Sequence, residues 1–195
     1  VVSGISQLGL RTGIITKLPA NEIGSFIKNK IRYSGTSDDY ITYDTGDSKR
    51  LGIYYYESGA FPRVSMVSYD RAGSSFTRFR RSDVDPSVYR SSKIFHVSGI
   101  TLGLGADIRS EVCEMMREFS ENGALVSFDV NYRAALWDEA TARDTVLSIL
   151  PCVNLLFVSE ETLRRMLGRS GTLSEIHLQL ASEYPGLKKI ARTMR

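Results

Sequence analysis

The feature that most constrains the fold is an alternation of short apolar runs with helix-like segments along residues 93–168. Three apolar runs have the length of strands, "KIFHVSGI", "ALVSFDVN" and "VNLLFVS", and each is followed by a segment with helical character. Continuous apolar strands joined by helices are typical of a parallel sheet that is covered on both faces. We therefore predict an α/β fold with a mostly parallel sheet flanked by helices.

The helical segments have recognisable starts and ends. In "GADIRSEVCEMMREFSENG", which Gly123 closes, apolar residues recur at helical spacing, namely Ile108, Val112, Met115, Met116 and Phe119. The segment "DEATARDTVLSILP" predicts a helix with Asp138 as its N-cap and Pro151 beyond its end. A third helix, "EETLRRMLG", is expected to end at Gly168.

The stretch 36–71 has a different character. "DDYITYDTGDSKRLGIYYYESG" and "RVSMVSYDR" carry Tyr, Ile, Thr and Val at strand-like spacing, and turn residues separate them. This pattern predicts a small antiparallel β-sheet inserted at about 36–71, in the manner of a lid over a ligand site.

Both ends of the sequence look like parts of a larger fold. "VVSGISQL" has the pattern of a helix end, with Gly9 as its stop before a strand at 13–16, and no helix start precedes it. At the other end, Pro185-Gly186 forms a turn, after which a new apolar segment begins. We expect a fragment whose first and last elements belong to a longer domain; the alternative is a complete small protein with frayed ends.

Composition excludes several classes of protein. A chain of 195 residues with 42% hydrophobic residues can bury a sizeable core as one domain, and a net charge of +3 does not suggest a nucleic-acid partner. The arginines in "TRFRRSD" (78–81) are expected to lie in a solvated loop. No apolar run approaches the roughly 18 residues of a membrane span. Cys113 and Cys152 lie among apolar residues, which indicates reduced thiols and a cytoplasmic protein.

The segment "VSFDVNYRAALW" contains the first candidate site. Asp129, Asn131 and Arg133 lie at the carboxyl end of a predicted strand, where open parallel sheets bind ligands. Alternate residues of an extended segment point to one side, so these side chains can converge. A guanidinium suits a carboxylate or a phosphate. The structural alternative is that Asp129 and Arg133 pair with each other and cap the next helix.

The second candidate site lies in "SYDRAGSS". Tyr69 and Arg71 are two residues apart and would offer a phenol and a guanidinium from one face of a lid strand. Among the three consecutive tyrosines 54–56, Tyr54 and Tyr56 would share a face. The alternatives are an exposed strand edge with a solvated Arg71, and core packing for at least one tyrosine. His96 is expected to be a packed, hydrogen-bonded residue of its strand.

Several ordered segments together are recognisable: "LGLRTGIITKLPANEIG", "RLGIYYYESGA", "YDRAGSS", "FHVSGITLGL", "VSFDVNYRAALW" and "NLLFVSEE". Nearly end to end, the chain resembles the ribokinase-like (PfkB) carbohydrate kinases, and among them the 2-keto-3-deoxygluconate kinases. The resemblance implies a partial kinase domain over 1–195 with a β-sheet lid. It also implies transfer of the γ-phosphoryl group of ATP to a hydroxyl of a sugar acid, with Mg²⁺.

The resemblance assigns roles to residues. Tyr54, Tyr69, Arg71 and Arg133 would bind the substrate, and Asn131, Arg133 and Thr193 would bind the nucleotide. The catalytic Asp of the family belongs to a G-A-G-D motif beyond Arg195, so no catalytic residue is assigned and the fragment alone is expected to be inactive. Ser159 and Thr162 replace the ends of an Asn-x-x-Glu motif linked to magnesium; the metal ligands therefore stay open, with Glu160 and Glu161 as candidates.

Other functions remain alternatives. The chain could be a sugar-binding or regulatory module without catalysis, or a kinase for fructose, ribose or 5-dehydro-2-deoxygluconate. The expected partners are a small sugar acid and ATP, with no nucleic acid and no membrane. By resemblance, we also expect a homo-oligomer that forms through the lid.

Overall fold

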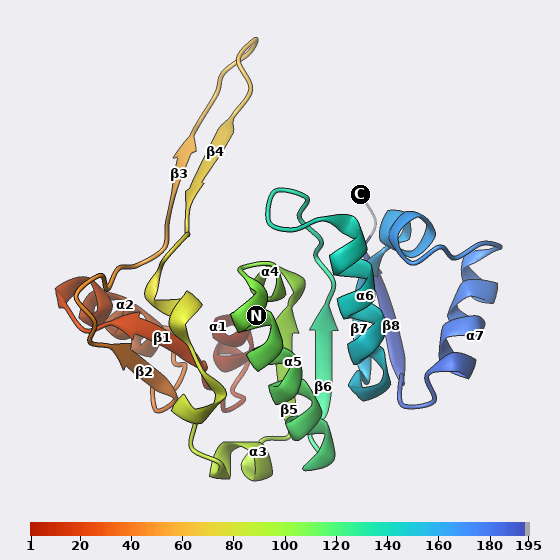
Figure 1. Ribbon diagram of the computed structural model, residues 1–195, viewed down its shortest axis with the longest axis horizontal. Coiled ribbons are helices and arrows are strands. Elements are labelled where there is room, and N and C mark those ends of the chain that lie inside the picture. The colour runs from red at the N-terminus through yellow and green to blue at the C-terminus, as the bar shows by residue number, and fades with distance from the viewer. Residues whose placement is uncertain (194–195) are drawn as a thin grey trace. The chain divides into compact units, whose positions relative to one another are not determined.

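The computed structural model describes residues 1–193, with only the backbone of Thr193, and divides the chain into two compact units, Val1–Asp85 and Pro86–Arg195. Figure 1 labels the elements of both units. The carboxyl-terminal unit contains the βα alternation that the sequence predicts, and the amino-terminal unit contains a small antiparallel sheet.

A four-stranded parallel sheet forms the centre of the Pro86–Arg195 unit. Its strands lie in the order β5 (Ile94–Ser98), β6 (Leu125–Asp129), β7 (Leu155–Ser159) and β8 (Lys189–Thr193), and every neighbouring pair is parallel. The helices are α3 (Ser87–Ser91), α4 (Gly99–Leu102), α5 (Ala106–Glu121), α6 (Glu139–Ile149) and α7 (Leu173–Glu183), with a 3₁₀ turn η3 (Leu150–Cys152). The predicted parallel α/β arrangement is confirmed.

Local sequence signals account for the helices of this unit. All five apolar residues at helical spacing in α5 are buried, and Gly123 closes the helix with a positive φ of 85°. The carboxylate of Asp138 accepts a hydrogen bond from the backbone N–H of Thr141 at 2.8 Å, which caps α6. These predictions are confirmed.

Aromatic side chains form part of the hydrophobic core between the sheet and helices α3 and α5. The ring of Phe119 on α5 stacks on Phe95 of β5 with 4.1 Å between centroids, and it contacts Tyr89 of α3 at 4.7 Å. Phe128 of β6 and Leu156 of β7 are fully buried. Burial of side chains of this size is the main source of stability for the sheet.

The helix expected at "EETLRRMLG" forms but has π geometry. The segment η4 (Thr162–Met166) includes a hydrogen bond from Leu167 N–H to the Thr162 carbonyl, five residues back. It ends at Gly168, which has a φ of 65°. The hydroxyl of Ser159 accepts from Thr162 N–H at 3.1 Å and so satisfies a donor at the start of the segment.

Two separate two-stranded sheets form the Val1–Asp85 unit. Strand β1 (Thr16–Pro19) pairs in parallel with β2 (Ile41–Asp44), and β3 (Ile53–Glu57) pairs antiparallel with β4 (Met66–Asp70). The antiparallel sheet is therefore narrower than predicted, since residues 41–44 belong to the parallel pair. Gly13 makes only an isolated bridge with Ser37, so the predicted strand at 13–16 begins three residues later.

The helices of this unit are α1 (Val2–Gln7), α2 (Glu22–Tyr33) and the 3₁₀ turns η1 (Ser75–Arg78) and η2 (Arg81–Asp83). Gly9, with a φ of 86°, follows α1 as predicted. Helix α2 was not predicted from the sequence. Its N-cap is Asn21, whose side-chain oxygen accepts from Gly24 N–H at 3.0 Å. Gly24 is required there because a Cβ would lie 1.9 Å from the Pro19 carbonyl oxygen.

Two predictions from composition can be compared with the structure. Within residues 1–193, no helix is long and apolar enough to span a bilayer. Cys113 and Cys152 are free thiols, and burial raises the pKa of Cys113 to about 11. A buried thiol with such a pKa stays protonated and unreactive at neutral pH.

Candidate functional site

An open cleft lies at the carboxyl ends of β6 and β7, where a parallel sheet binds ligands. Its volume is about 710 Å³. Its lining includes Asp129, Asn131, Arg133, Ser159, Glu160 and Arg192. The sequence prediction that Asp129, Asn131 and Arg133, at the end of β6 and just beyond it, converge on one region is therefore confirmed within the Pro86–Arg195 unit.

The backbone after β6 turns sharply to enter the cleft. Asn131 has a φ of 34°, in the left-handed region that asparagine tolerates better than most residues. Its side-chain amide donates to the Ser98 hydroxyl at 3.3 Å, which ties the loop to the end of β5. Gly99 makes this approach possible, because a Cβ there would lie 2.0 Å from the Val130 carbonyl oxygen.

Arg133 is the cation of the cleft that has no acidic partner among residues 1–193. Its guanidinium donates only to the Tyr132 carbonyl, at 3.4 Å, and the side chain is exposed. The alternative in which Asp129 pairs with Arg133 is not realised, and Asp138 rather than either of them caps α6. A free guanidinium at this position can bind an incoming carboxylate or phosphate.

The other arginines that line the cleft, Arg165 and Arg192, form ion pairs with carboxylates. Arg192 and Arg164 both donate to Glu160, at 2.6 and 2.9 Å, and Arg165 pairs with Glu139 at 3.1 Å. The hydrogen bonds from Arg164 and then Arg192 hold the pKa of Glu160 below its usual value. These pairs were not predicted from the sequence, although the spacing of four residues between Glu160 and Arg164 is a signal for a helical ion pair.

The described side chains do not form a magnesium site built from protein ligands alone. Mg²⁺ prefers octahedral oxygen ligands, with carboxylates that are free to coordinate it. Glu160 is held by two arginines, and the hydroxyls of Ser159 and Thr162 bond to each other at 2.8 Å. No group of three or more His, Cys, Asp or Glu side chains in residues 1–193 could hold a metal ion.

The lid residues singled out from the sequence lie together on the β3–β4 hairpin. Tyr54 pairs directly with Tyr69, with 6.2 Å between ring centroids. The guanidinium carbon of Arg71 lies 4.1 Å from the Tyr69 centroid, within range of a cation–π interaction. Tyr54, Tyr55 and Tyr56 are each more than 60% exposed, so the alternative of core packing for one of them is wrong within the described structure.

The predicted site residues thus form two groups, one in each unit. Tyr54, Tyr69 and Arg71 make up the hairpin group, and Asn131 and Arg133 make up the loop group. That both groups bind one ligand stays a prediction. The side chain of Thr193 lies outside the described part of the chain; its backbone pairs with Ser159 in the sheet.

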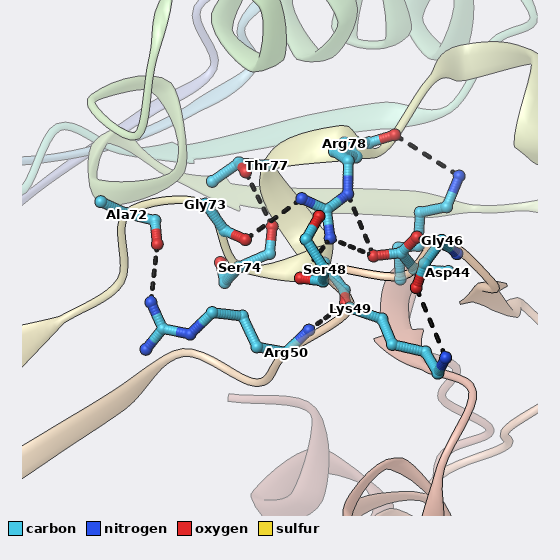
Figure 2. A network of polar contacts seen from close by, with 12 residues as sticks. Asp44, Gly46, Ser48, Lys49, Arg50, Ala72, Gly73, Ser74, Thr77 and Arg78 are labelled. Atoms are coloured by element: carbon cyan, nitrogen blue, oxygen red, sulfur yellow. Dashed lines mark hydrogen bonds and ion pairs between the residues drawn. The ribbon is translucent and has the colours of Figure 1, made fainter.

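The base of the hairpin is held by a network of polar contacts (Figure 2). Arg78 donates to the buried carboxylate of Asp44 through Nε at 3.0 Å and also through Nη2, and it donates to the carbonyls of Ser48 and Gly73. Arg50 donates to the Ala72 carbonyl at 2.7 Å. The expectation of a solvated charge run is therefore wrong for Arg78, which joins the two segments that lead into and out of the hairpin.

His96 has a structural role, as expected. Its Nδ1 shares a hydrogen bond of 2.9 Å with the Ser127 hydroxyl of the neighbouring strand. Burial lowers the pKa of His96, and the charge of Asp129 opposes part of this effect. The ring is therefore neutral at physiological pH.

Comparison with known proteins identifies the class to which this fold and cleft belong. The family model described as pfkB family carbohydrate kinase matches residues 1–191. The chain belongs to the pfkB family of carbohydrate kinases. The resemblance inferred from the sequence motifs is thereby confirmed at the level of the family.

The similar proteins act on several substrates according to their names. The 2-dehydro-3-deoxygalactonokinase of Haloferax volcanii is 32% identical over 94% of this chain and 57% of its own length. The probable fructokinase-4 of Arabidopsis thaliana is 31% identical over 92% of this chain and 54% of its own length. The crystal structure of 2-dehydro-3-deoxygluconokinase from Thermotoga maritima has a TM-score of 0.90 at 32% identity, covering 100% of this chain and 60% of that one. The chain therefore spans between half and two thirds of each relative.

Proposed function

We propose that the protein that carries this chain is a cytoplasmic kinase that transfers the γ-phosphoryl group of ATP to a hydroxyl of a sugar acid of the 2-keto-3-deoxygluconate type. Its membership of the pfkB family supports the kinase reaction. The names of two similar proteins, a 2-dehydro-3-deoxygalactonokinase and a 2-dehydro-3-deoxygluconokinase, support the substrate class. The observation that carries the proposal is the unpaired guanidinium of Arg133 in a cleft at the carboxyl ends of the strands.

The proposed roles follow from the chemistry of the side chains. Phosphoryl transfer depends mainly on positioning and on neutralising phosphate charge. Arg133 would bind the substrate and the transferred phosphate, and Asn131 and Thr193 would contact the nucleotide. Arg71, with Tyr54 and Tyr69, would bind the sugar acid from the hairpin. The nucleotide would enter as its magnesium complex, since Mg²⁺ is commonly held by substrate phosphates rather than by an all-protein site.

Replacing Arg133 by alanine is expected to weaken binding of 2-keto-3-deoxygluconate by about 1.5–3 kcal/mol, because a charge-assisted hydrogen bond is lost. This corresponds to roughly a tenfold to hundredfold increase in Kd. Isothermal titration calorimetry on the complete polypeptide that carries this sequence measures the change. Fructose, which has no carboxylate, serves as the comparison ligand.

Arg165→Ala is the matched control for Arg133→Ala. Arg165 lines the same cleft but pairs with Glu139 and Glu161, so its removal should change the affinity by at most about 1 kcal/mol. Equal losses for the two variants would remove Arg133 from the binding site. Tighter binding of fructose than of the acid would favour the alternative, a neutral-sugar kinase, which the similarity to a fructokinase keeps open.

A second proposal concerns self-association through the hairpin. All ten residues of β3 and β4 are exposed, and an isolated two-stranded hairpin is only marginally stable in water. On the face opposite Tyr54 and Tyr69, the strands carry the apolar side chains of Ile53, Tyr55 and Met66 alternating with Glu57, Ser68 and Asp70. We propose that a second copy of the chain covers this face, because pairing would bury its exposed apolar side chains and support a hairpin that is marginal on its own.

Tyr55→Ser should convert a dimer into a monomer in sedimentation velocity experiments, because it removes the central aromatic ring of that face. Tyr33→Ser is the control, since Tyr33 is an equally apolar side chain that is 91% exposed on α2. The proposal is contradicted if the unmodified protein sediments as a monomer at every concentration, or if both variants behave alike.

A further inference from the structure

The loop that presents Arg133 is closed on itself by hydrogen bonds. The hydroxyl of Tyr132 donates to the Trp137 carbonyl at 3.2 Å, and Leu136 N–H donates to the Arg133 carbonyl at 2.9 Å. At its entrance, Asn131 takes the left-handed conformation and bonds to Ser98. The backbone on both sides of Arg133 is therefore fixed, although the Arg133 side chain is exposed.

Trp137 anchors the exit of this loop. Its side chain is 8% exposed and lies against Gly103, where a Cβ would be 3.1 Å from the indole Nε1 and 3.0 Å from Cβ of Leu136. The guanidinium carbon of Arg109 lies 5.4 Å from the centre of the indole ring. The end of the loop is thus packed between the residue that follows α4 and a side chain of α5.

The indole N–H of Trp137 is buried and has no hydrogen-bond partner within residues 1–193. An unsatisfied buried donor costs free energy, and a phenylalanine at this position would avoid that cost. Hydrogen bonding therefore does not account for a tryptophan here. The size of the indole ring explains the tryptophan, because the ring contacts both Gly103 and Arg109 and so fixes the end of the loop.

We infer that Tyr132 and Trp137 are positioning residues that hold Arg133 in the geometry needed to bind an anionic ligand, and that a ligand on Arg133 changes the environment of the Trp137 ring. The Tyr132 hydroxyl joins the residue next to Arg133 to the backbone of Trp137, so a shift at either residue reaches the other. The inference rests on the proposed role of Arg133 in anion binding. It adds Tyr132 and Trp137 as the residues that position the Arg133 guanidinium for this role.

The sequence provides a specific probe for this inference, since Trp137 is the single tryptophan among 195 residues. Sodium tripolyphosphate, which carries the phosphate charge of a nucleotide without its absorbing base, is the test ligand. We expect its titration to change the Trp137 emission saturably in the unmodified protein. We expect Tyr132→Phe to raise the apparent Kd roughly threefold to tenfold, on the scale of one neutral hydrogen bond, and to lower the thermal midpoint by no more than a few degrees.

A double-mutant cycle separates positioning from a merely structural effect. In an Arg133→Ala background, Tyr132→Phe should cause no further loss of affinity, because there is no guanidinium left to position. Additive losses, or a Tyr132→Phe affinity equal to that of the unmodified protein, would overturn the inference. Calorimetric binding without any change in Trp137 emission would also overturn it.

Variants of Trp137 itself give an independent check by calorimetry. Trp137→Phe should keep part of the affinity, because the smaller ring still fills the site beside Gly103 but packs less closely against Arg109, whereas Trp137→Ala should lose it. Similar affinities for the two variants would contradict the anchor role. If Arg133→Ala alone left the affinity unchanged, the proposed function would fail; if Arg133→Ala weakened binding and Tyr132→Phe did not, only the present inference would fail.

Discussion

Gly99→Ala is expected to destabilise the Pro86–Arg195 unit by about 3 kcal/mol or more, at or above the upper end of ordinary overpacking costs. The added Cβ would lie 2.0 Å from the carbonyl oxygen and 3.0 Å from the carbonyl carbon of Val130. Both atoms belong to the backbone, so no side-chain rotation can relieve the clash. Urea denaturation followed by the emission of Trp137 measures the change, because that residue lies in this unit.

Gly186→Ala is the matched control within the same unit. A Cβ at Gly186 would make ordinary contacts, the nearest at 3.5 Å from the Pro151 carbonyl oxygen, so the variant should unfold at nearly the same urea concentration as the unmodified protein. Equal midpoints for the Gly99 and Gly186 variants would show that the ends of β5 and β6 can move apart freely.

The same contact links the stability of the fold to the geometry of the cleft. Gly99 permits the backbone of Val130 to approach the end of β5, and Asn131, the next residue, then bonds to Ser98. If Gly99→Ala folds at all, the Asn131–Ser98 contact should lengthen and the loop that carries Arg133 should shift with it. Gly99 therefore helps to set the geometry of the cleft without lining it.

The sequence predicts most of the Pro86–Arg195 unit because its signals are local. The burial of the apolar face of α5 follows from the helical period alone, and the cap at Asp138 follows from residue type and position. The place of Asn131 and Arg133 in the cleft follows from the rule that open parallel sheets bind ligands at the carboxyl ends of their strands, whereas the alternation of an extended segment does not apply, because Asn131 has a left-handed φ of 34°. None of these predictions needs knowledge of which strand neighbours which.

The predictions that failed concern residues whose strand or ion-pair partner lies far away in the sequence. Residues 41–44 have the alternation of a strand, but alternation does not say that their partner is β1, in parallel, rather than the hairpin. The role of Arg78 was missed for a related reason, since its carboxylate partner Asp44 lies 34 residues away in the chain. The pairs that Glu160 makes with Arg164 and Arg192 show both cases: the first has a local spacing that signals it, and the second depends on the β7–β8 pairing.

Arg78→Ala is expected to destabilise the Val1–Asp85 unit, because it leaves the Asp44 carboxylate, whose side chain is 8% exposed, without its cationic partner. Breaking a buried ion pair costs roughly 3–5 kcal/mol, and the lower end applies here because the Arg78 side chain is 36% exposed. Amide hydrogen exchange at β1 and β2 measures the loss locally. Figure 2 shows the carbonyl contacts of Arg78 that are lost with it.

Arg63→Ala is the control for this prediction. Arg63 pairs with Glu57 on the same hairpin, but both side chains are more than half exposed, so its removal should cost at most about 1 kcal/mol. A similar change in protection for the two variants would mean that the Asp44–Arg78 pair contributes no more than a surface ion pair does.

The pH dependence of stability provides a second signature of the Asp44–Arg78 pair. Burial alone would raise the pKa of Asp44, but hydrogen bonds from Arg78, Ser75 and the Gly46 N–H outweigh it and lower the pKa. The Asp44 carboxylate of the unfolded chain, with a pKa of about 3.9, therefore takes up its proton at a higher pH than the folded carboxylate does. The stabilisation is present above about pH 4 and is lost as the pH falls through the folded pKa. In Arg78→Ala the folded pKa should rise, since burial then acts with fewer opposing bonds. The acid loss of hydrogen-exchange protection at β1 and β2 should therefore begin at a higher pH in this variant, and an unchanged acid profile would contradict the assignment of the pair.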